Sequence, residues 1–166
     1  MKTTENLAEA FAGESQANRK YLAYGEAAAK DRLPQVAKLF RAVAAAETIH
    51  AHAHLRAMGG IKATAENLRD AIAGEKYEFE EMYPAFVETA ENEGARMAAL
   101  SMKRALDVEK VHHGLFTGAL EAVETGSDLP EGSIHVCAIC GHTVVGGVPD
   151  QCPVCMAKAG AFTEIL

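Results

Sequence analysis

Two stretches of the chain carry the pattern Glu-x-x-His, and their positions constrain the fold more than any other feature. The first is Glu47–His50 in "AAAETIHAHAH", and the second is Glu109–His112 in "DVEKVHH". Residues three or four apart share one face of a helix, so each pattern places a carboxylate beside an imidazole. The pattern alone is weak, because a chain with 18 Glu and 7 His contains it by chance. Its placement within the helices is informative.

Apolar residues recur at helical intervals in four long segments, residues 4–30, 34–58, 75–92 and 95–124. Pro34 separates the first two segments, Gly59 and Gly60 end the second, and Gly94 separates the last two. A further short helix within "AENLRDAIAG" is expected before the third segment, which Pro84 is expected to bend. The sequence therefore predicts a mainly α protein built around a four-helix bundle.

The acidic residues lie at matching depths in these expected helices. Glu14 precedes the break at 30–34 by as much as Glu47 follows it, and Glu78 and Glu81 precede Gly94 by about as much as Glu109 follows it. At 1.5 Å per residue, each lies about 20–25 Å from its turn. Buried carboxylates without a partner cost several kcal/mol each, whereas two iron or manganese ions would use such ligands. We therefore expect a two-metal site with the ligands Glu14, Glu47, His50, Glu109, His112 and one or both of Glu78 and Glu81.

Several other polar residues have two interpretations. Tyr21 lies on the same helix face as Glu14, so it either hydrogen-bonds a ligand or an oxidant, or packs in the core. His54 lies one turn beyond His50 and is a weaker candidate, as is His113. The remaining candidates are expected on the surface or in the core: His52, Glu88, Glu91 and Glu93 on the surface, and Tyr24 and Tyr83 in the core.

All four cysteines fall in the last thirty residues, as the pairs Cys137–Cys140 and Cys152–Cys155. Two C-x-x-C pairs are typical of a tetrahedral four-thiolate metal site, with disulfide pairing as the alternative. By spacing alone zinc is slightly favoured over iron, and only iron would carry an electron. The polar stretch before this tail suggests three parts, a bundle over 1–125, a linker over 126–133 and a metal-binding domain over 134–166.

Charge and hydropathy limit the partners of the chain. The net charge of -7 disfavours nucleic acid and anionic membrane surfaces. The polar N-terminal stretch does not resemble a signal peptide, and no apolar run approaches the length of a membrane span. The expected location is the cytoplasm, where cysteine pairs are more often metal ligands than disulfides.

Across nearly its whole length the chain resembles the rubrerythrin family. The matching stretches are "GES" at Glu14, "AETIHAHAH" at Glu47, "GEKYEFEEMYP" at Glu78 and Glu81, and "VEKVHH" at Glu109. The tail "HVCAICGHTVVGGVPDQCPVC" resembles the rubredoxin-like domain of that family. The resemblance implies a ferritin-like bundle followed by a rubredoxin-like domain. It also favours iron over zinc in the four-cysteine site.

The resemblance implies a non-haem peroxidase that reduces hydrogen peroxide to water and protects an anaerobe or microaerobe from oxidative stress. Two iron ions would be bound, with Glu47 and Glu109 bridging them. Tyr21, Glu81 and His50 would take part in catalysis, the last two where one iron changes its ligand with oxidation state. The implied metal ligands are Glu14, Glu47, His50, Glu78, Glu81, Glu109 and His112 for the two iron ions, and Cys137, Cys140, Cys152 and Cys155 for the third.

The implied electron source is an external rubredoxin or an NAD(P)H-linked reductase, with the thiolate iron as relay. A homodimer or higher homo-oligomer is also implied, in some members with helices exchanged between subunits. Two other functions stay open at this point, iron storage and a binding module in which a zinc ribbon follows an inert bundle. The appended thiolate domain argues against storage, and the aligned ligands argue against an inert bundle.

Overall fold

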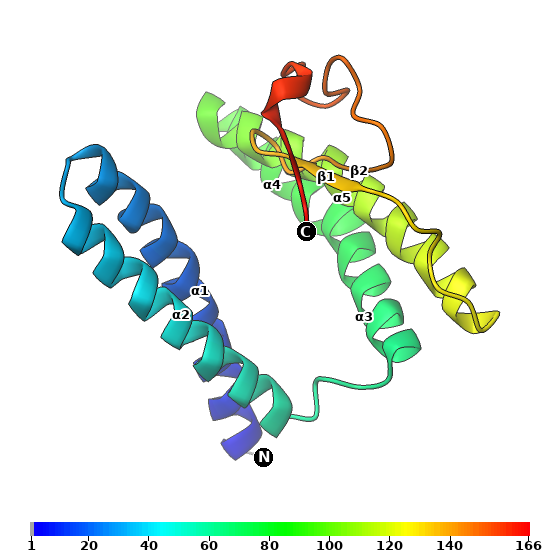
Figure 1. Ribbon diagram of the computed structural model, residues 1–166, viewed down its shortest axis with the longest axis horizontal. Coiled ribbons are helices and arrows are strands. Elements are labelled where there is room, and N and C mark those ends of the chain that lie inside the picture. The colour runs from blue at the N-terminus through cyan, green and yellow to red at the C-terminus, as the bar shows by residue number, and fades with distance from the viewer. Residues whose placement is uncertain (1) are drawn as a thin grey trace. The chain divides into compact units, whose positions relative to one another are not determined.

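The computed structural model describes residues 2–166 (Figure 1). Its elements are α1 (Lys2–Lys30), α2 (Pro34–Ala57), α3 (Thr64–Tyr77), the π-helix η1 (Glu78–Met82), α4 (Tyr83–Asn92), α5 (Arg96–Glu124), β1 (Ile134–Cys137), β2 (Thr143–Val145), the 3₁₀-helix η2 (Ala159–Ala161) and β3 (Phe162–Glu164). The chain divides into two compact units, one ending at Lys62 and the other spanning Ala63–Leu166.

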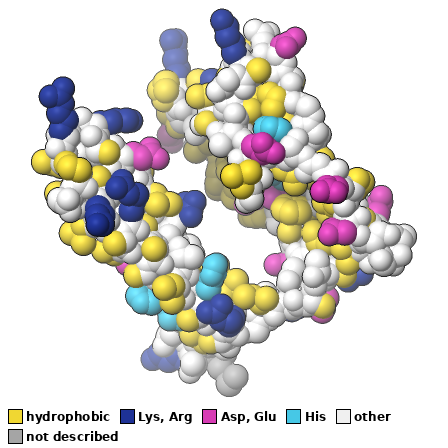
Figure 2. Space-filling view, viewed as in Figure 1, with side chains coloured by type: hydrophobic (Ala, Val, Ile, Leu, Met, Phe, Trp, Pro, Cys, Tyr) yellow, Lys and Arg dark blue, Asp and Glu magenta, His cyan; other side chains and the backbone are white. Residues whose placement is uncertain are grey.

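The first unit is an antiparallel hairpin of α1 and α2. Small residues line its interface, and Ala37 and Ala44 are each only 1% exposed. A Cβ atom on Gly25 would lie 3.3 Å from the carbonyl oxygen of Ala37, so glycine permits the close approach of the two helices. Larger apolar side chains such as Leu39 and Ile49 stay exposed on this unit, and Figure 2 shows apolar side chains spread over its surface. The abundance of alanine is thus explained by tight helix packing.

A buried amide fixes the register of this hairpin. The Asn18 side chain is 6% exposed, and its Nδ2 donates to the carbonyl oxygen of Ala44 at 2.6 Å and to Oγ1 of Thr48 at 2.7 Å. Its Oδ1 accepts from Nε of Arg19 at 2.9 Å. Because Asn18 lies one turn after Glu14 and Thr48 is adjacent to Glu47, this contact holds the two acidic residues level.

Several helix boundaries lie at the proline and glycine residues from which the sequence predicted them. Pro34 occupies the first turn of α2, and α2 ends just before Gly59, whose φ of +68° a residue with a side chain rarely adopts. Gly94, with φ +70°, separates α4 from α5 as predicted. The predicted start of the third segment at residue 75 is wrong, because the helix begins at Thr64 and runs without a loop into η1. The expected short helix is therefore the first half of a longer one.

The predicted bend near Pro84 takes the form of a π-helix. Proline has no N–H to donate, and its ring clashes with the carbonyl group four residues earlier. The backbone widens over Glu78–Met82, and the N–H of Tyr83 donates to the carbonyl oxygen of Glu78, five residues back. Such π-turns insert one residue and rotate the residues before them relative to those after. The side chains that precede Glu78 therefore point in other directions, relative to those that follow Met82, than they would in a regular α-helix.

In the second unit α3 and α4 run along α5, and a small sheet follows (Figure 1). The sheet has the strand order β2-β1-β3, with both pairs antiparallel. Val136 pairs with Thr143 on one side and with Thr163 on the other. β2 contacts α5, and a Cβ atom on Gly141 would lie 3.8 Å from Cγ1 of the buried Val108 of α5.

The unit boundary at residues 62/63 differs from the expected boundary near 126–133, and the three expected domains stay a prediction. Residues 125–133 form an irregular connection between α5 and β1. Within residues 2–166, none of the helices combines the length and the apolar character needed to cross a bilayer.

Candidate metal centres

In the first unit, Glu14, Glu47 and His50 bring ligand atoms within 4.8 Å of one another. Nδ1 of His50 lies 2.9 Å from Oε2 of Glu47 and 4.0 Å from Oε1 of Glu14. Both glutamates are partly buried, while the His50 side chain is 55% exposed. Figure 2 shows histidine side chains gathered on this hairpin. The three residues that the sequence placed at one depth thus lie together.

In the second unit, Glu75, Glu109 and His112 form a matching group, again within 4.8 Å. Nδ1 of His112 lies 2.8 Å from Oε2 of Glu109 and 3.9 Å from Oε2 of Glu75. The side chains of Glu75 and Glu109 are 19% and 15% exposed. Each unit therefore holds a Glu-x-x-His pair and one further carboxylate from the neighbouring helix.

These donor sets fit a metal ion. Two carboxylates and an imidazole nitrogen within a few ångströms concentrate lone pairs and negative charge, which a metal ion or a shared proton would offset. Carboxylate oxygens with one imidazole nitrogen are suitable ligands for iron and manganese. In the second unit, burial and then the charge of Glu109 raise the pKa of Glu75, while the charge of His112 acts to lower it.

The structure brings Glu75 to the site that the sequence analysis assigned to Glu78 and Glu81. Glu78 is half-buried next to it, and burial followed by the charge of Glu75 raises the pKa of Glu78. Glu81 is exposed and belongs to neither of the two groups. Glu78 and Glu81 as ligands stay predictions, whereas Glu75 lies in one group with Glu109 and His112.

A signal for Glu75 was present in the sequence. Glu75 precedes Gly94 by nearly as many residues as His112 follows it, so the two lie level in an antiparallel pair. The distances of acidic residues from Gly94 were compared with that of Glu109 alone, and not with that of His112. In addition, the π-helix changes which residues share a face with those before it, and a regular-helix count does not include this shift.

Other candidates are placed as follows. The Tyr21 ring packs against Tyr24 and Phe40, with ring centres 6.3 and 6.1 Å away, and its catalytic role stays a prediction. Tyr83, expected only in the core, lies near the acidic group: burial and then the charge of Glu78 raise its pKa. His52 is exposed as expected, His54 is half-buried, and His113 packs edge-on against Phe79 at 5.4 Å.

The raised pKa of Glu75 predicts how the metal-free protein responds to pH. Its folded pKa lies above the ordinary value of 4.5, so the folded state holds more protons than the unfolded chain just above that pH. This contribution to stability is complete below pH 4.5 and is lost as pH rises through the folded pKa. We expect thermal unfolding of the metal-free protein, with the cysteine site filled, to show a smaller loss of stability with rising pH in Glu75→Gln.

The matched control for this test is Glu88→Gln, at an exposed position of α4. That variant should keep the pH profile of the unmodified protein. If Glu75→Gln and Glu88→Gln follow the same profile, the crowding of carboxylates at Glu75 is refuted.

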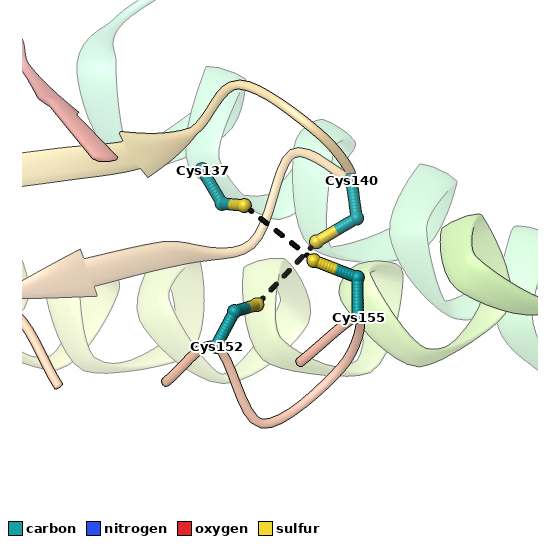
Figure 3. Close-up of side chains that lie close together, drawn as sticks. All are labelled: Cys137, Cys140, Cys152 and Cys155. Atoms are coloured by element: carbon teal, nitrogen blue, oxygen red, sulfur yellow. Dashed lines mark hydrogen bonds between the residues drawn. The ribbon is translucent and has the colours of Figure 1, made fainter. Parts of the chain in front are cut away.

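The four cysteines converge on one point in the second unit (Figure 3). All four sulfur atoms lie within 4.8 Å of one another, with 3.7 Å between Cys137 and Cys155 and 3.6 Å between Cys140 and Cys152. These separations are much longer than a disulfide bond. They match the edges of a tetrahedron with metal–sulfur bonds of about 2.3 Å, which are about 3.8 Å long. The cysteines therefore fit a single tetrahedral metal ion.

Backbone N–H groups prepare the sulfur atoms for this role. At Cys152 burial acts to raise the pKa, but N–H groups of Cys155 and Val154, with the neighbouring thiols, lower it to about 7. Burial raises the pKa of Cys140 and of Cys155. A metal ion has to displace the remaining protons, and its binding is therefore coupled to pH.

Strand β2 of the cysteine domain also touches the carboxylate group of the second unit. Oγ1 of Thr143 lies 3.1 Å from Nε2 of His112. Next to Thr143, His142 is buried, and burial followed by the charge of His112 lowers its pKa. The two candidate metal centres of this unit are thus joined by one side-chain contact.

Comparison with known families gives two matches. The family described as Rubrerythrin matches residues 5–120, and the one described as Rubrerythrin, rubredoxin-like domain, matches residues 135–163. The chain is 33% identical to Rubrerythrin-2 of Clostridium acetobutylicum, covering 96% of this chain and 95% of that protein. It is 36% identical to Rubrerythrin of Porphyromonas gingivalis, covering 97% and 88%.

Solved structures give the same relationship. A structure of nigerythrin described as fully reduced and all ferrous has a TM-score of 0.59 and 32% sequence identity, covering 98% of this chain and 86% of that one. A mixed-valence structure of nigerythrin has a TM-score of 0.57 at 33% identity, with the same coverage. The predicted mainly α fold, ferritin-like with a rubredoxin-like domain, is thereby confirmed.

Proposed function

Because the chain belongs to the rubrerythrin family, we propose that it is a non-haem di-iron peroxidase that reduces hydrogen peroxide to water. The observation that carries this proposal is the pair of matching carboxylate–imidazole groups, together with a four-sulfur site in the same chain. Protection of an anaerobic or microaerobic cell against oxidative stress, in the cytoplasm, is the role that fits such an activity.

We assign one carboxylate–imidazole group to each iron ion. Glu14, Glu47 and His50 would hold one, and Glu75, Glu109 and His112 the other, with Glu78 available beside Glu75. Bound as ferrous ions, the two metals would act as Lewis acids and supply the two electrons that reduction of peroxide requires. The carboxylates balance the positive charge of these ions and fix their positions.

The protein must also supply protons, because reduction of peroxide to two waters consumes two. The carboxyl group of Glu78 would hold one, since burial and the charge of Glu75 raise its pKa and so favour its protonated form. The phenol oxygen of Tyr83 keeps its proton for a similar reason, burial and the charge of Glu78. Tyr21 stays a further candidate, from the family resemblance alone.

The cysteine site would hold the iron that returns electrons to the carboxylate site. The contact between Thr143 and His112 supports this, since it joins the cysteine domain directly to a proposed ligand. An external rubredoxin or an NAD(P)H-linked reductase would be the donor, and the chain would work as a homodimer or higher homo-oligomer. Zinc at the four cysteines would remove the relay.

The proposal is tested by comparing oxidants on the reduced, iron-loaded protein. A peroxidase should be oxidised by hydrogen peroxide much faster than by oxygen. An iron-storage protein should instead turn over free ferrous iron with oxygen, and that result would overturn the proposal. Metal analysis adds a second criterion, because a binding module would contain zinc at the cysteines and no iron at the carboxylates.

A further inference from the structure

We propose that Thr143 is a positioning residue, which holds His112 in the tautomer that leaves Nδ1 free to bind metal. The inference rests on the proposed function, since it concerns a ligand of the carboxylate site. It starts from two contacts of a single hydroxyl group. Oγ1 of Thr143 lies 3.1 Å from Nε2 of His112 and 3.1 Å from the carbonyl oxygen of Gly141.

The direction of the two hydrogen bonds follows from the number of protons. A threonine hydroxyl has one proton to donate, and a carbonyl oxygen can only accept. If both contacts are hydrogen bonds, the Thr143 proton is directed at the carbonyl oxygen of Gly141. The contact with His112 is then a hydrogen bond only if Nε2 of His112 carries a proton and donates it to Oγ1.

The opposite side of the imidazole ring is the one that faces the acids. With the proton on Nε2, the lone pair of Nδ1 points at Oε2 of Glu109, 2.8 Å away, and towards Oε2 of Glu75 at 3.9 Å. Two lone pairs at 2.8 Å repel, so a metal ion or a second proton is needed between them. Thr143 thus selects the form of His112 whose free nitrogen faces the carboxylate oxygens.

The backbone around Thr143 is held in place by strand pairing and by packing on α5. It begins β2 and pairs with Val136 of β1, while the preceding Gly141 lies against Val108 of α5. Gly141 has φ +85°, which lets the chain turn there between Cys140 and the strand. By contrast, the contacts of His50 to Glu47 and Glu14 in the other group are made by Nδ1, and its side chain is 55% exposed. The two histidines are therefore held differently.

The test uses three variants of the full-length chain. Thr143→Val keeps the shape and removes both hydrogen bonds, and Thr143→Ser keeps the hydroxyl group. Thr163→Val makes the same chemical change at an exposed position of β3, on the other side of β1. All proteins carry zinc at the cysteine site, so that histidine nitrogen signals can be followed by NMR while zinc is added against a competing chelator.

For the unmodified protein, Thr143→Ser and Thr163→Val, we expect a proton on Nε2 of His112 and zinc on Nδ1. Thr143→Val should lose the protected Nε2 proton, and zinc should bind about 10–100-fold more weakly at His112, the usual effect of removing a partner of a metal-bound histidine. The His50 signals serve as an internal reference. A separate sample of each variant is loaded with iron at the cysteine site. Its absorption spectrum should match that of the unmodified protein, which shows that the cysteine site is intact.

The proposal is overturned if Thr143→Val keeps both the Nε2 proton and the zinc affinity of the unmodified protein. It is also overturned if Thr143→Ser is as impaired as Thr143→Val, because the hydroxyl group would then not be the cause. In both cases zinc still binds at His112 of the unmodified protein, and the proposed function stands. If the unmodified protein binds no metal at His112, the proposed function fails, and this inference fails with it.

Discussion

Replacement of Glu75 by alanine is expected to remove the metal site of the second unit and with it the reaction with peroxide. Glu75 supplies one of the two carboxylates that face Nδ1 of His112. Loss of a residue that merely orients a ligand costs about 10–100-fold in metal affinity or activity, so loss of a ligand should cost at least about 100-fold. Iron content and the rate of oxidation by peroxide measure the effect.

Glu81→Ala is the matched comparison for Glu75→Ala. Glu81 is exposed in η1, and surface substitutions usually change stability by no more than about 0.5 kcal/mol, or about twofold in an equilibrium. We therefore expect near-normal iron content and peroxide reaction in Glu81→Ala. The reverse outcome, a severe loss in Glu81→Ala and a mild one in Glu75→Ala, would show that the depth comparison in the sequence was right and the placement of Glu75 wrong.

Replacement of Cys152 by serine is expected to abolish steady-state peroxide reduction while sparing a single turnover. Cys152 is buried and supplies one corner of the four-sulfur site. Without it the red ferric-thiolate colour should be absent, and turnover supported by a reductase should fall by more than about 100-fold. The carboxylate groups are untouched, so protein reduced beforehand should still be oxidised once by peroxide.

Ala138→Ser is the control for Cys152→Ser. It places a serine in the loop between Cys137 and Cys140 at an exposed position and leaves all four cysteines in place. It should keep the red colour and the turnover of the unmodified protein. If Cys152→Ser retained full steady-state turnover, the thiolate iron would not be the relay, and electrons would have to reach the carboxylate site by another route.

The helical part of the fold was accessible from the sequence because its boundaries are set by local chemistry. Within a helix, Pro34 is favoured in the first turn, and Gly59 and Gly94 adopt positive φ angles that end one helix before the next. The level placement of Glu14 with Glu47 follows from the same boundaries. The four-cysteine site was accessible because its spacing alone indicates a tetrahedral set of ligands.

The sequence analysis missed Glu75, which lies where the backbone departs from a regular helix. The π-helix at Glu78–Met82 rotates α3 relative to α4, so Glu75 faces His112, although counting turns from Glu109 favoured Glu78 and Glu81. Thr143 could not be found from a pattern, since its partner His112 lies 31 residues away and only the docking of β2 on α5 brings them together. Glu75 and Thr143, the two residues that the sequence analysis missed, both contact His112 in the candidate site.

The most direct test of the account follows the colour of the iron-loaded protein. The protein is reduced without oxygen until the ferric-thiolate red bleaches, stoichiometric hydrogen peroxide is added, and the return of the colour is timed. Electron transfer from the thiolate iron to the carboxylate site predicts rapid return in the unmodified protein and a return slowed at least about 100-fold in Glu47→Ala, which lacks a carboxylate of the first unit. A slow return in the unmodified protein, or an equally rapid return in Glu47→Ala, would contradict it.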